Sequence, residues 1–419
     1  MMLSKWPVPA GVRWNFDDAE NMLRWLANAR GHAVAFDDAS FAEVWTIVAL
    51  TALARGAKPE VFVDIFPDGP VGRFAYAIGM AAILEQERRS IEVEPDRSVK
   101  VQSIEPAPRG YGQYEDIARG IGQLLLPSQE EEPAFETVRY VLVELLRNAV
   151  QHSVDPLGGV VAAQRMDTGP HQSKPVVQVA VADAGIGIFR ALRAKHPKIG
   201  SPREALTRAI EPHISGTFEE GLTSNETNTN AGLFFISEMA KLTGGRMMIA
   251  TREATMILQA NEDDPGRGKT HYLEPGVGYD GTLVVFELPV LSAHDFAGMI
   301  DVIRARAKQR TPSRNLHRWL RFEEPPENVM RLLVGRVKAE NTSEAKEYAD
   351  QTITPRLAKK EPVALDFRNM ESATQSFVHA LLYEPIRLGW ALKTPIYIVN
   401  ASPAVRSMLE LLESYALGG

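Results

Sequence analysis

The feature that most constrains this chain is a helix-forming segment with two unlike faces at residues 130–153. Glu144, Asn148 and His152 lie four residues apart. Each such step turns an α-helix by only about 40°, so the three side chains share one face. The opposite face is apolar and would pack on a sheet. A solvated helix surface can carry the same polar stripe, so the stripe needs further support before it indicates a site.

An apolar strand supplies some of that support. It runs through VQVAVAD and ends in Asp183, which is followed by Gly185 and Gly187. This pattern places an acceptor at a strand tip and lets the backbone approach a ligand closely. A simple Asp-Gly turn would give the same sequence.

Two later segments complete the set. Asn230, Ala231, Gly232 and Leu233 precede a predicted helix, whose unsatisfied N–H groups would favour phosphate. Gly244 and Gly245 are placed to end that helix. Residues 281–282, Gly-Thr, begin the last strand of this region.

In this order and at these separations, the four segments resemble the motifs of the GHKL ATPases, which include histidine kinases, anti-sigma serine kinases and the gyrase group. ELLRNAVQH resembles the N box, DAGIG the first glycine box, NAGLFFI the second, and GT the last. The resemblance implies an α/β protein with a central Bergerat-fold sandwich, in which a mixed sheet has helices on one face. It also implies that ATP and Mg²⁺ bind there.

The resemblance carries roles onto matching positions. Asn148 would coordinate Mg²⁺ through its amide oxygen, a hard ligand for a hard cation. Asp183 would accept a hydrogen bond from the adenine amine, with Thr282 supporting it. Gly185 and Gly187 would shape the adenine pocket.

The remaining roles concern phosphate and catalysis. Asn230, Gly232 and Leu233 would bind the phosphates, the last two through backbone N–H groups, and Glu144 would be the catalytic general base. Asparagines at 228 and 230 stand where the family has glycines. Asparagine tolerates positive φ better than most residues, so the backbone path can survive.

The chain divides into four predicted parts. Residues 1–105 form a small α/β domain, residues 106–292 the ATPase domain, residues 293–328 a basic helical linker, and residues 329–419 a second small α/β domain. Residues 92–110 are interpreted as a connection and residues 261–280 as a loop insertion. The C-terminal part resembles STAS-like domains, and the N-terminal part resembles them more weakly.

Three hydroxyl residues follow the predicted strand VALDF, where related anti-sigma antagonists carry a phosphorylated serine or threonine. Ser372, Thr374 and Ser376 are therefore candidate phosphoacceptors. The alternative is that they cap the next helix, as serine and threonine commonly do. Ser40 is the equivalent position in the N-terminal part.

Composition excludes several classes of function. The 46 basic and 53 acidic residues give a net charge of −7, which provides no overall attraction for nucleic acid or anionic lipid. There are no cysteines to form disulfides or bind metal. The longest apolar run is far below the roughly 20 residues of a membrane span, and the start does not resemble a signal peptide. We therefore expect a cytoplasmic protein.

The leading hypothesis is an ATP-dependent switch, reset by hydrolysis, that signals through STAS-like domains. ATP would order a lid at about 212–230 and favour a homodimer or a complex with a protein partner. One alternative is a serine/threonine protein kinase of the anti-sigma type acting on a STAS-like domain. Another is an interaction scaffold that binds ATP without hydrolysing it.

Overall fold

The computed structural model shows a mixed α/β protein that divides into two compact units, Met1–Ala209 with Ile236–His294, and Ile210–Phe235 with Asp295–Gly419. It describes residues 5–7, 13–29, 31–35, 40–55, 62–64, 69–85, 98–106, 113–128, 131–167, 174–212, 232–261, 268–290, 295–310, 319–337 and 341–418. Among the helices of these segments, none is long and apolar enough to cross a membrane.

The first unit begins with a small parallel α/β layer, in the part of the chain where a small α/β domain is predicted. Its strands are β1 (Lys5–Pro7), β3 (Ala33–Ala35) and β5 (Phe62–Asp64) in the order β1-β3-β5, with a separate parallel pair of β2 (Arg13–Trp14) and β4 (Phe41–Ala42). Its helices are η1 (Phe16–Asp18), α1 (Ala19–Asn28), α2 (Val44–Ala54), α3 (Pro70–Ala77) and α4 (Met80–Ile83).

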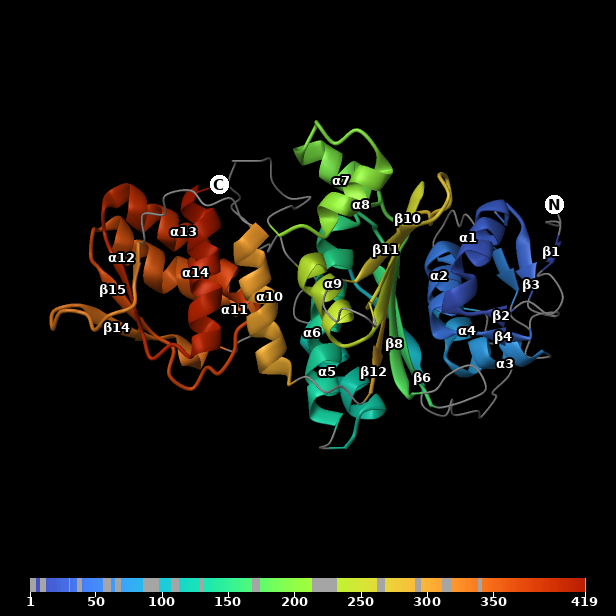
Figure 1. The fold of residues 1–419 in the computed structure, drawn as a ribbon, viewed down its shortest axis with the longest axis horizontal. Coiled ribbons are helices and arrows are strands. Elements are labelled where there is room, and N and C mark those ends of the chain that lie inside the picture. Colours follow the sequence, from blue (N-terminus) through green and yellow to red (C-terminus); the bar gives the residue numbers. More distant parts are fainter. Residues whose placement is uncertain are drawn as a thin grey trace. The chain divides into compact units, whose positions relative to one another are not determined.

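A seven-stranded sheet forms the centre of this unit, in the order β11-β10-β9-β12-β8-β7-β6 (Figure 1). Its strands are β6 (Ser98–Ile104), β7 (Gly159–Met166), β8 (Val176–Asp183), β9 (Arg246–Thr251), β10 (Ala254–Gln259), β11 (Lys269–Tyr272) and β12 (Thr282–Pro289). Every neighbouring pair is antiparallel. The expected mixed sheet is therefore wrong.

Two segments that we predicted to be irregular contribute strands to this sheet. β6 lies inside the presumed connection, and β11 lies inside the presumed loop insertion. In β6 the buried residues Val99, Val101 and Ile104 are separated by exposed or half-buried ones. This is the pattern of a strand with one buried face.

One face of the sheet is covered by α6 (Glu132–His152), which packs on β7, β8 and β12, while α5 (Gln113–Leu125) packs on α6. The other helices of this region are α7 (Ile188–Lys195), α8 (Pro202–Ala209) and α9 (Gly232–Leu242). Gly244 follows α9 with φ of 76°, as expected of a residue that ends a helix.

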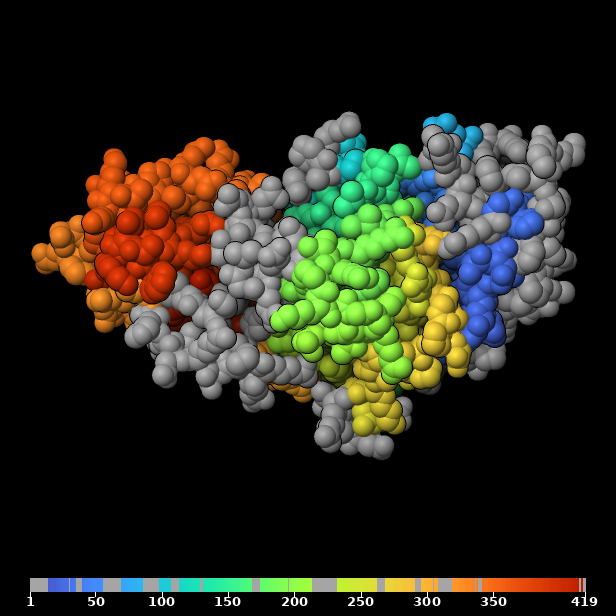
Figure 2. All heavy atoms as spheres, turned by 90° about the horizontal axis from the view of Figure 1, so that it is seen from above, coloured from blue at the N-terminus to red at the C-terminus, as the bar shows by residue number. Residues whose placement is uncertain are grey.

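Helix α8 is attached to the edge of the sheet. It packs on β10, and its Thr207 hydroxyl lies 2.6 Å from the Tyr272 hydroxyl of β11. The guanidinium of Arg203 lies over the same tyrosine ring, 4.3 Å from its centroid. In Figure 2 the surface of α7 and α8 accordingly lies beside that of β10 and β11.

The second face of the sheet is covered by α2, which contacts β7 and β8. Every residue of α2 from Val44 to Leu53 is buried, and a helix that is apolar on all sides needs cover on all sides. Its side chains share one continuous core with Ala180 and Ala182 of β8. Helices therefore cover both faces of this sheet: α6 from the predicted ATPase domain, and α2 from the N-terminal part, whose packing on the sheet was not predicted.

A buried polar cluster joins the N-terminal layer to the sheet. Gln178 of β8 donates to the Glu43 carboxylate at 2.7 Å, and the Phe16 N–H donates to the same carboxylate at 2.9 Å. Arg246 of β9 pairs with Glu287 of β12 at 3.1 Å. Burial, reinforced by the nearby negative charge of Glu287, raises the pKa of Glu43 to about 7.

The second unit contains a four-stranded parallel sheet in the order β13-β16-β15-β14. Its strands are β13 (Leu320–Arg321), β14 (Met330–Leu333), β15 (Val363–Asp366) and β16 (Ile396–Val399). Its helical segments are α10 (Phe296–Arg310), η3 (Val334–Arg336), α11 (Thr342–Tyr348), the π-helical turn η4 (Ala349–Ile353), α12 (Thr354–Ala358), α13 (Gln375–Leu392) and α14 (Pro403–Gly418).

The segment predicted as a linker, residues 293–328, belongs to this second fold. Its helix α10 packs on α14, and its strand β13 forms the edge of the sheet beside β16. The Trp319 indole N–H, just before β13, donates to the carbonyl of Thr394 at 2.9 Å. The helix expected in this segment is present as α10, and β13 is a strand that the sequence did not indicate.

Candidate functional site

Asp183 lies at the end of β8, in a row of paired residues that crosses four strands. Gly159 of β7 and Thr282 of β12 flank it, and Thr251 of β9 lies beyond Thr282. Successive side chains alternate between the faces of a strand. Since Ala180 and Ala182 face α2, Asp183 is on the face that α6 covers.

The Asp183 carboxylate is buried, with only 4% of the residue exposed. The Gly185 N–H donates to its Oδ1 at 2.9 Å, and the N–H and hydroxyl of Thr282 donate to it as well. Burial nevertheless raises its pKa to about 7, and the charge of Asp155 adds to this effect. The Asp183 carboxylate is therefore a hydrogen-bond acceptor that solvent hardly reaches. A donor group on a ligand would stabilise its ionised form.

Close packing explains two glycines beside this carboxylate. A Cβ on Gly185 would lie 2.0 Å from the carbonyl oxygen of Ser153, just after α6. A Cβ on Gly281 would lie 2.0 Å from the carbonyl oxygen of Asp183 itself, and Gly281 has φ of 131°. Only glycine fits at such approaches. Gly187 is the residue before α7.

Helix α6 brings the polar stripe to this region of the sheet. Glu144 is buried, and its Oε1 accepts a hydrogen bond from Arg147 at 3.0 Å, with both side chains 2% exposed. Asn148 is half-buried, and its amide makes no hydrogen bond within the part of the chain that the structure describes. Burial lowers the pKa of His152 to about 4, so this imidazole is neutral at pH 7. Sequence reasoning missed Arg147, although its position three residues after Glu144 on one helix is a spacing at which such pairs form.

The predicted phosphate-binding segment is described only in part. Asn230 and the predicted lid, apart from residue 212, lie outside the described residues. Gly232 and Leu233 are the first two residues of α9, with Gly232 buried and Leu233 half-buried. A helix therefore begins where the sequence predicts one.

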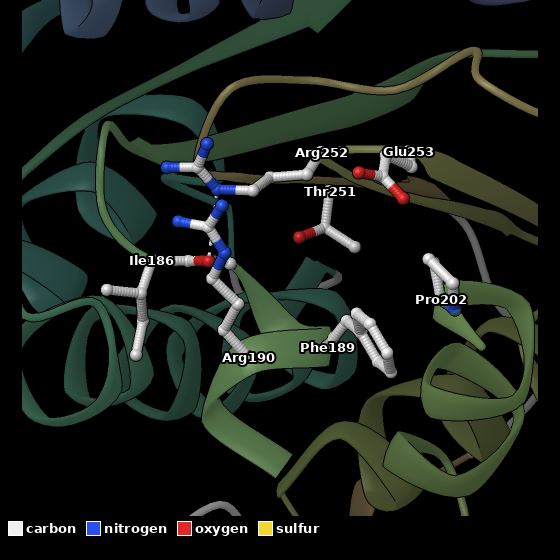
Figure 3. Close-up of a pocket in the computed structure, with 8 residues that line it drawn as sticks. Ile186, Phe189, Arg190, Pro202, Thr251, Arg252 and Glu253 are labelled. Carbon is white, nitrogen blue, oxygen red and sulfur yellow. Dashed lines mark hydrogen bonds between the residues drawn. The ribbon is translucent and has the colours of Figure 1, made fainter. Parts of the chain in front are cut away.

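A small pocket lies beside the Gly185–Gly187 loop, between α7, α8 and the turn after β9 (Figure 3). Its lining residues are Ile186, Gly187, Phe189, Arg190, Pro202, Thr251, Arg252 and Glu253. Asp183 is not among them. In this turn the Arg252 guanidinium donates to the carbonyls of Gly185 and Ile186, at 2.9 and 3.1 Å.

The residues present fit a nucleotide with Mg²⁺ on two counts. Asp183 is a buried acceptor whose remaining capacity suits an N–H donor. Asn148 offers an amide oxygen that no described residue engages, a ligand type that Mg²⁺ accepts. No group of three or more histidine, aspartate or glutamate side chains in the described residues is arranged to hold a metal. The ion would therefore need oxygen ligands from the phosphates and water.

The three candidate phosphoacceptors of the second unit differ in accessibility. Thr374 is buried and caps α13, accepting a hydrogen bond from the Phe377 N–H at 3.1 Å. Ser376 is fully buried inside that helix, whereas Ser372 is exposed in the preceding loop. Capping thus accounts for Thr374, and Ser372 alone of the three is accessible.

Comparison with known proteins identifies no family model that matches this chain and no curated protein that matches it.

Proposed function

We propose that this chain binds ATP and Mg²⁺ on the α6 side of its seven-stranded sheet, as a GHKL-type ATPase that acts as a switch. The central sheet would be a Bergerat-type sandwich, and the second unit a STAS-like signalling domain. The observation that supports this most is the buried Asp183 carboxylate, held by Gly185 and Thr282 at the end of β8. A buried carboxylate with an unfilled acceptor suits the exocyclic amine of adenine.

The other residues of the proposed site would bind Mg²⁺ and the phosphates. Asn148 would hold Mg²⁺ together with phosphate oxygens and water, and the ion would offset the negative charge of the phosphates. Gly232 and Leu233 would donate backbone N–H groups at the start of α9. Gly185 lets the loop approach Ser153 just after α6, on the side of the sheet that Asp183 faces.

Glu144 is the residue we propose as the proton acceptor in hydrolysis. Water would attack the γ-phosphorus, Glu144 would take the water's proton, and the bond to the bridging oxygen of ADP would break. Arg147 orients this carboxylate through the ion pair at 3.0 Å. The same ion pair favours the alternative of a non-hydrolysing scaffold, because it occupies one carboxylate oxygen.

The kinase alternative also has an observation in its favour. Ser372 is an exposed hydroxyl in the loop between β15 and α13 of the second unit. In that reaction a serine hydroxyl would replace water as the attacking group. Incubation with γ-labelled ATP separates the three functions: free phosphate indicates the ATPase, labelled Ser372 the kinase, and binding without either product the scaffold.

Calorimetric titration with ATP and Mg²⁺ tests binding at the proposed site. We expect Asp183→Ala to weaken ATP binding by roughly 10-fold or more, the value of a hydrogen bond to a charged group. Asp116→Ala is a matched control, because Asp116 is exposed on α5. Equal affinity in the wild type and Asp183→Ala would remove Asp183 from the site.

A further inference from the structure

Arg252 occupies the two-residue turn between β9 and β10, with φ of 23°. Its Nη2 donates to the Gly185 carbonyl at 2.9 Å and its Nε to the Ile186 carbonyl at 3.1 Å. Figure 3 shows the side chain extending over the loop that carries Ile186. Two carbonyls of the Asp183 loop are thus held by one planar guanidinium, which is suited to such paired bonding.

The same loop is anchored from its other side by the backbone of the residue after α6. The Ile186 N–H donates to the Ser153 carbonyl at 2.8 Å. The peptide unit between Gly185 and Ile186 is therefore fixed at both ends, its C=O by Arg252 and its N–H by Ser153. In the preceding peptide unit, the Gly185 N–H donates to Asp183 Oδ1 at 2.9 Å.

Thr251, the residue before Arg252, extends this support. Its Oγ1 accepts from the Ile188 N–H at 3.0 Å and donates to the Gly281 carbonyl at 2.9 Å. The end of β9 thus bonds to the Asp183 loop and to the residue before Thr282. Both donors to the Asp183 carboxylate, Gly185 and Thr282, adjoin backbone that this turn holds.

We propose that Arg252 is a positioning residue that sets the orientation of Asp183 for reading a 6-amino purine. This inference rests on the proposed function, in which Asp183 accepts from the adenine amine. Holding the Gly185–Ile186 peptide restrains Gly185, which keeps the Gly185 N–H of the preceding peptide on Asp183 Oδ1 and leaves the rest of the carboxylate aimed at the ligand. Without Arg252 the loop would be less restrained, and the preference for a 6-amino purine would fall. Binding of the phosphates would be unchanged.

The test compares ATP with ITP, which carries an oxygen in place of the 6-amino group. Calorimetry with each nucleotide and Mg²⁺ gives a ratio of dissociation constants. We expect the wild type to favour ATP on the order of 10- to 100-fold, the range for one hydrogen bond to a charged group. In Arg252→Met this ratio should fall below about 3-fold, while ITP affinity stays within about 3-fold of wild type.

Two further variants make the comparison specific. Arg252→Lys keeps the charge but lacks the planar fork, so we expect an intermediate ratio, and this variant also guards against misfolding of Arg252→Met. Arg190→Met is the matched control, because Arg190 lines the same pocket and makes none of the loop's hydrogen bonds among the described residues. It should keep the wild-type ratio.

The outcomes separate this inference from the function on which it rests. If the wild type favours ATP and both Arg252 variants keep that preference, the positioning role is overturned and ATP binding stands. If the variants lose ATP and ITP equally, Arg252 is a general structural support and the proposal also fails. A wild-type protein that binds neither nucleotide would refute the proposed function, and this inference with it.

Discussion

At the scale of single residues, the ionisation of Asp183 should control nucleotide affinity. A pKa of about 7 means that the carboxyl is largely protonated at pH 6 and largely ionised at pH 8. Only the ionised form is a pure acceptor for an amine donor. The raised pKa also makes the folded state less stable when Asp183 ionises. The stabilising contribution of the protonated carboxyl is fully present below the ordinary pKa of 3.8 and is lost as pH rises through about 7.

We therefore predict that ATP affinity rises by roughly 10-fold between pH 6 and pH 8, as expected when one required group titrates near 7. Asp183→Asn cannot titrate, so it should lack this component and leave only the pH dependence of ATP itself. Isothermal titration at several pH values measures the difference between the two profiles. Parallel profiles would show that Asp183 does not titrate in the binding step.

The sequence predicts some of these residues better than others. The neighbouring positions of Asp183 and Thr282 were predicted from the resemblance to the GHKL motifs, and the two residues are paired across β8 and β12. The side-chain partners of Arg147 and Arg252 were not predicted. The Glu144–Arg147 spacing of three residues permits a helical ion pair, but it does not show that the pair is buried. Nothing in the local sequence places Arg252 on the Gly185 carbonyl, because that contact joins segments far apart in the chain.

At the scale of elements, the polar cluster between α2 and the sheet should make stability depend on pH. Glu43 accepts from Phe16, Trp45 and Gln178 just before α2. Its pKa is raised to about 7, mainly by burial. Its contribution to stability is thus fully present below the ordinary value of 4.5 and is lost as pH rises through about 7.

Replacement of Glu43 by glutamine should remove this dependence. Between pH 5 and pH 8 we expect the free energy of unfolding of the wild type to fall by about 3 kcal/mol more than that of Glu43→Gln, since one unit of pKa shift corresponds to about 1.4 kcal/mol. Urea unfolding at several pH values gives both slopes. Identical slopes would show that Glu43 is not the titrating group.

Local sequence patterns predict some of the strands and helices and miss others. The segments that became β8 and β12 are apolar runs of ordinary strand length and were predicted as strands. β6 was missed because charged and proline residues surround its alternating core, and β11 because it is short and exposed at the sheet edge. The burial of α2 against β7 and β8 is a long-range contact that no local pattern reveals.

At the scale of the whole molecule, two α/β units of different sheet type share one chain. The first has an antiparallel seven-stranded sheet with helices on both faces, and the second has a parallel four-stranded sheet. The first holds Glu144, Asn148 and Asp183, and the second holds Ser372. The expected homodimer or partner complex remains a prediction, which sedimentation with and without nucleotide would address.

The central claim is that adenine binds at the end of β8 and Mg²⁺ binds at α6. A crystal structure of the protein with a non-hydrolysable ATP analogue and Mg²⁺ tests it most directly. We predict that the adenine amine lies about 3 Å from an Asp183 carboxylate oxygen and that the Asn148 amide oxygen coordinates the ion at about 2.1 Å. A nucleotide bound elsewhere, or an adenine amine turned away from Asp183, would contradict the account.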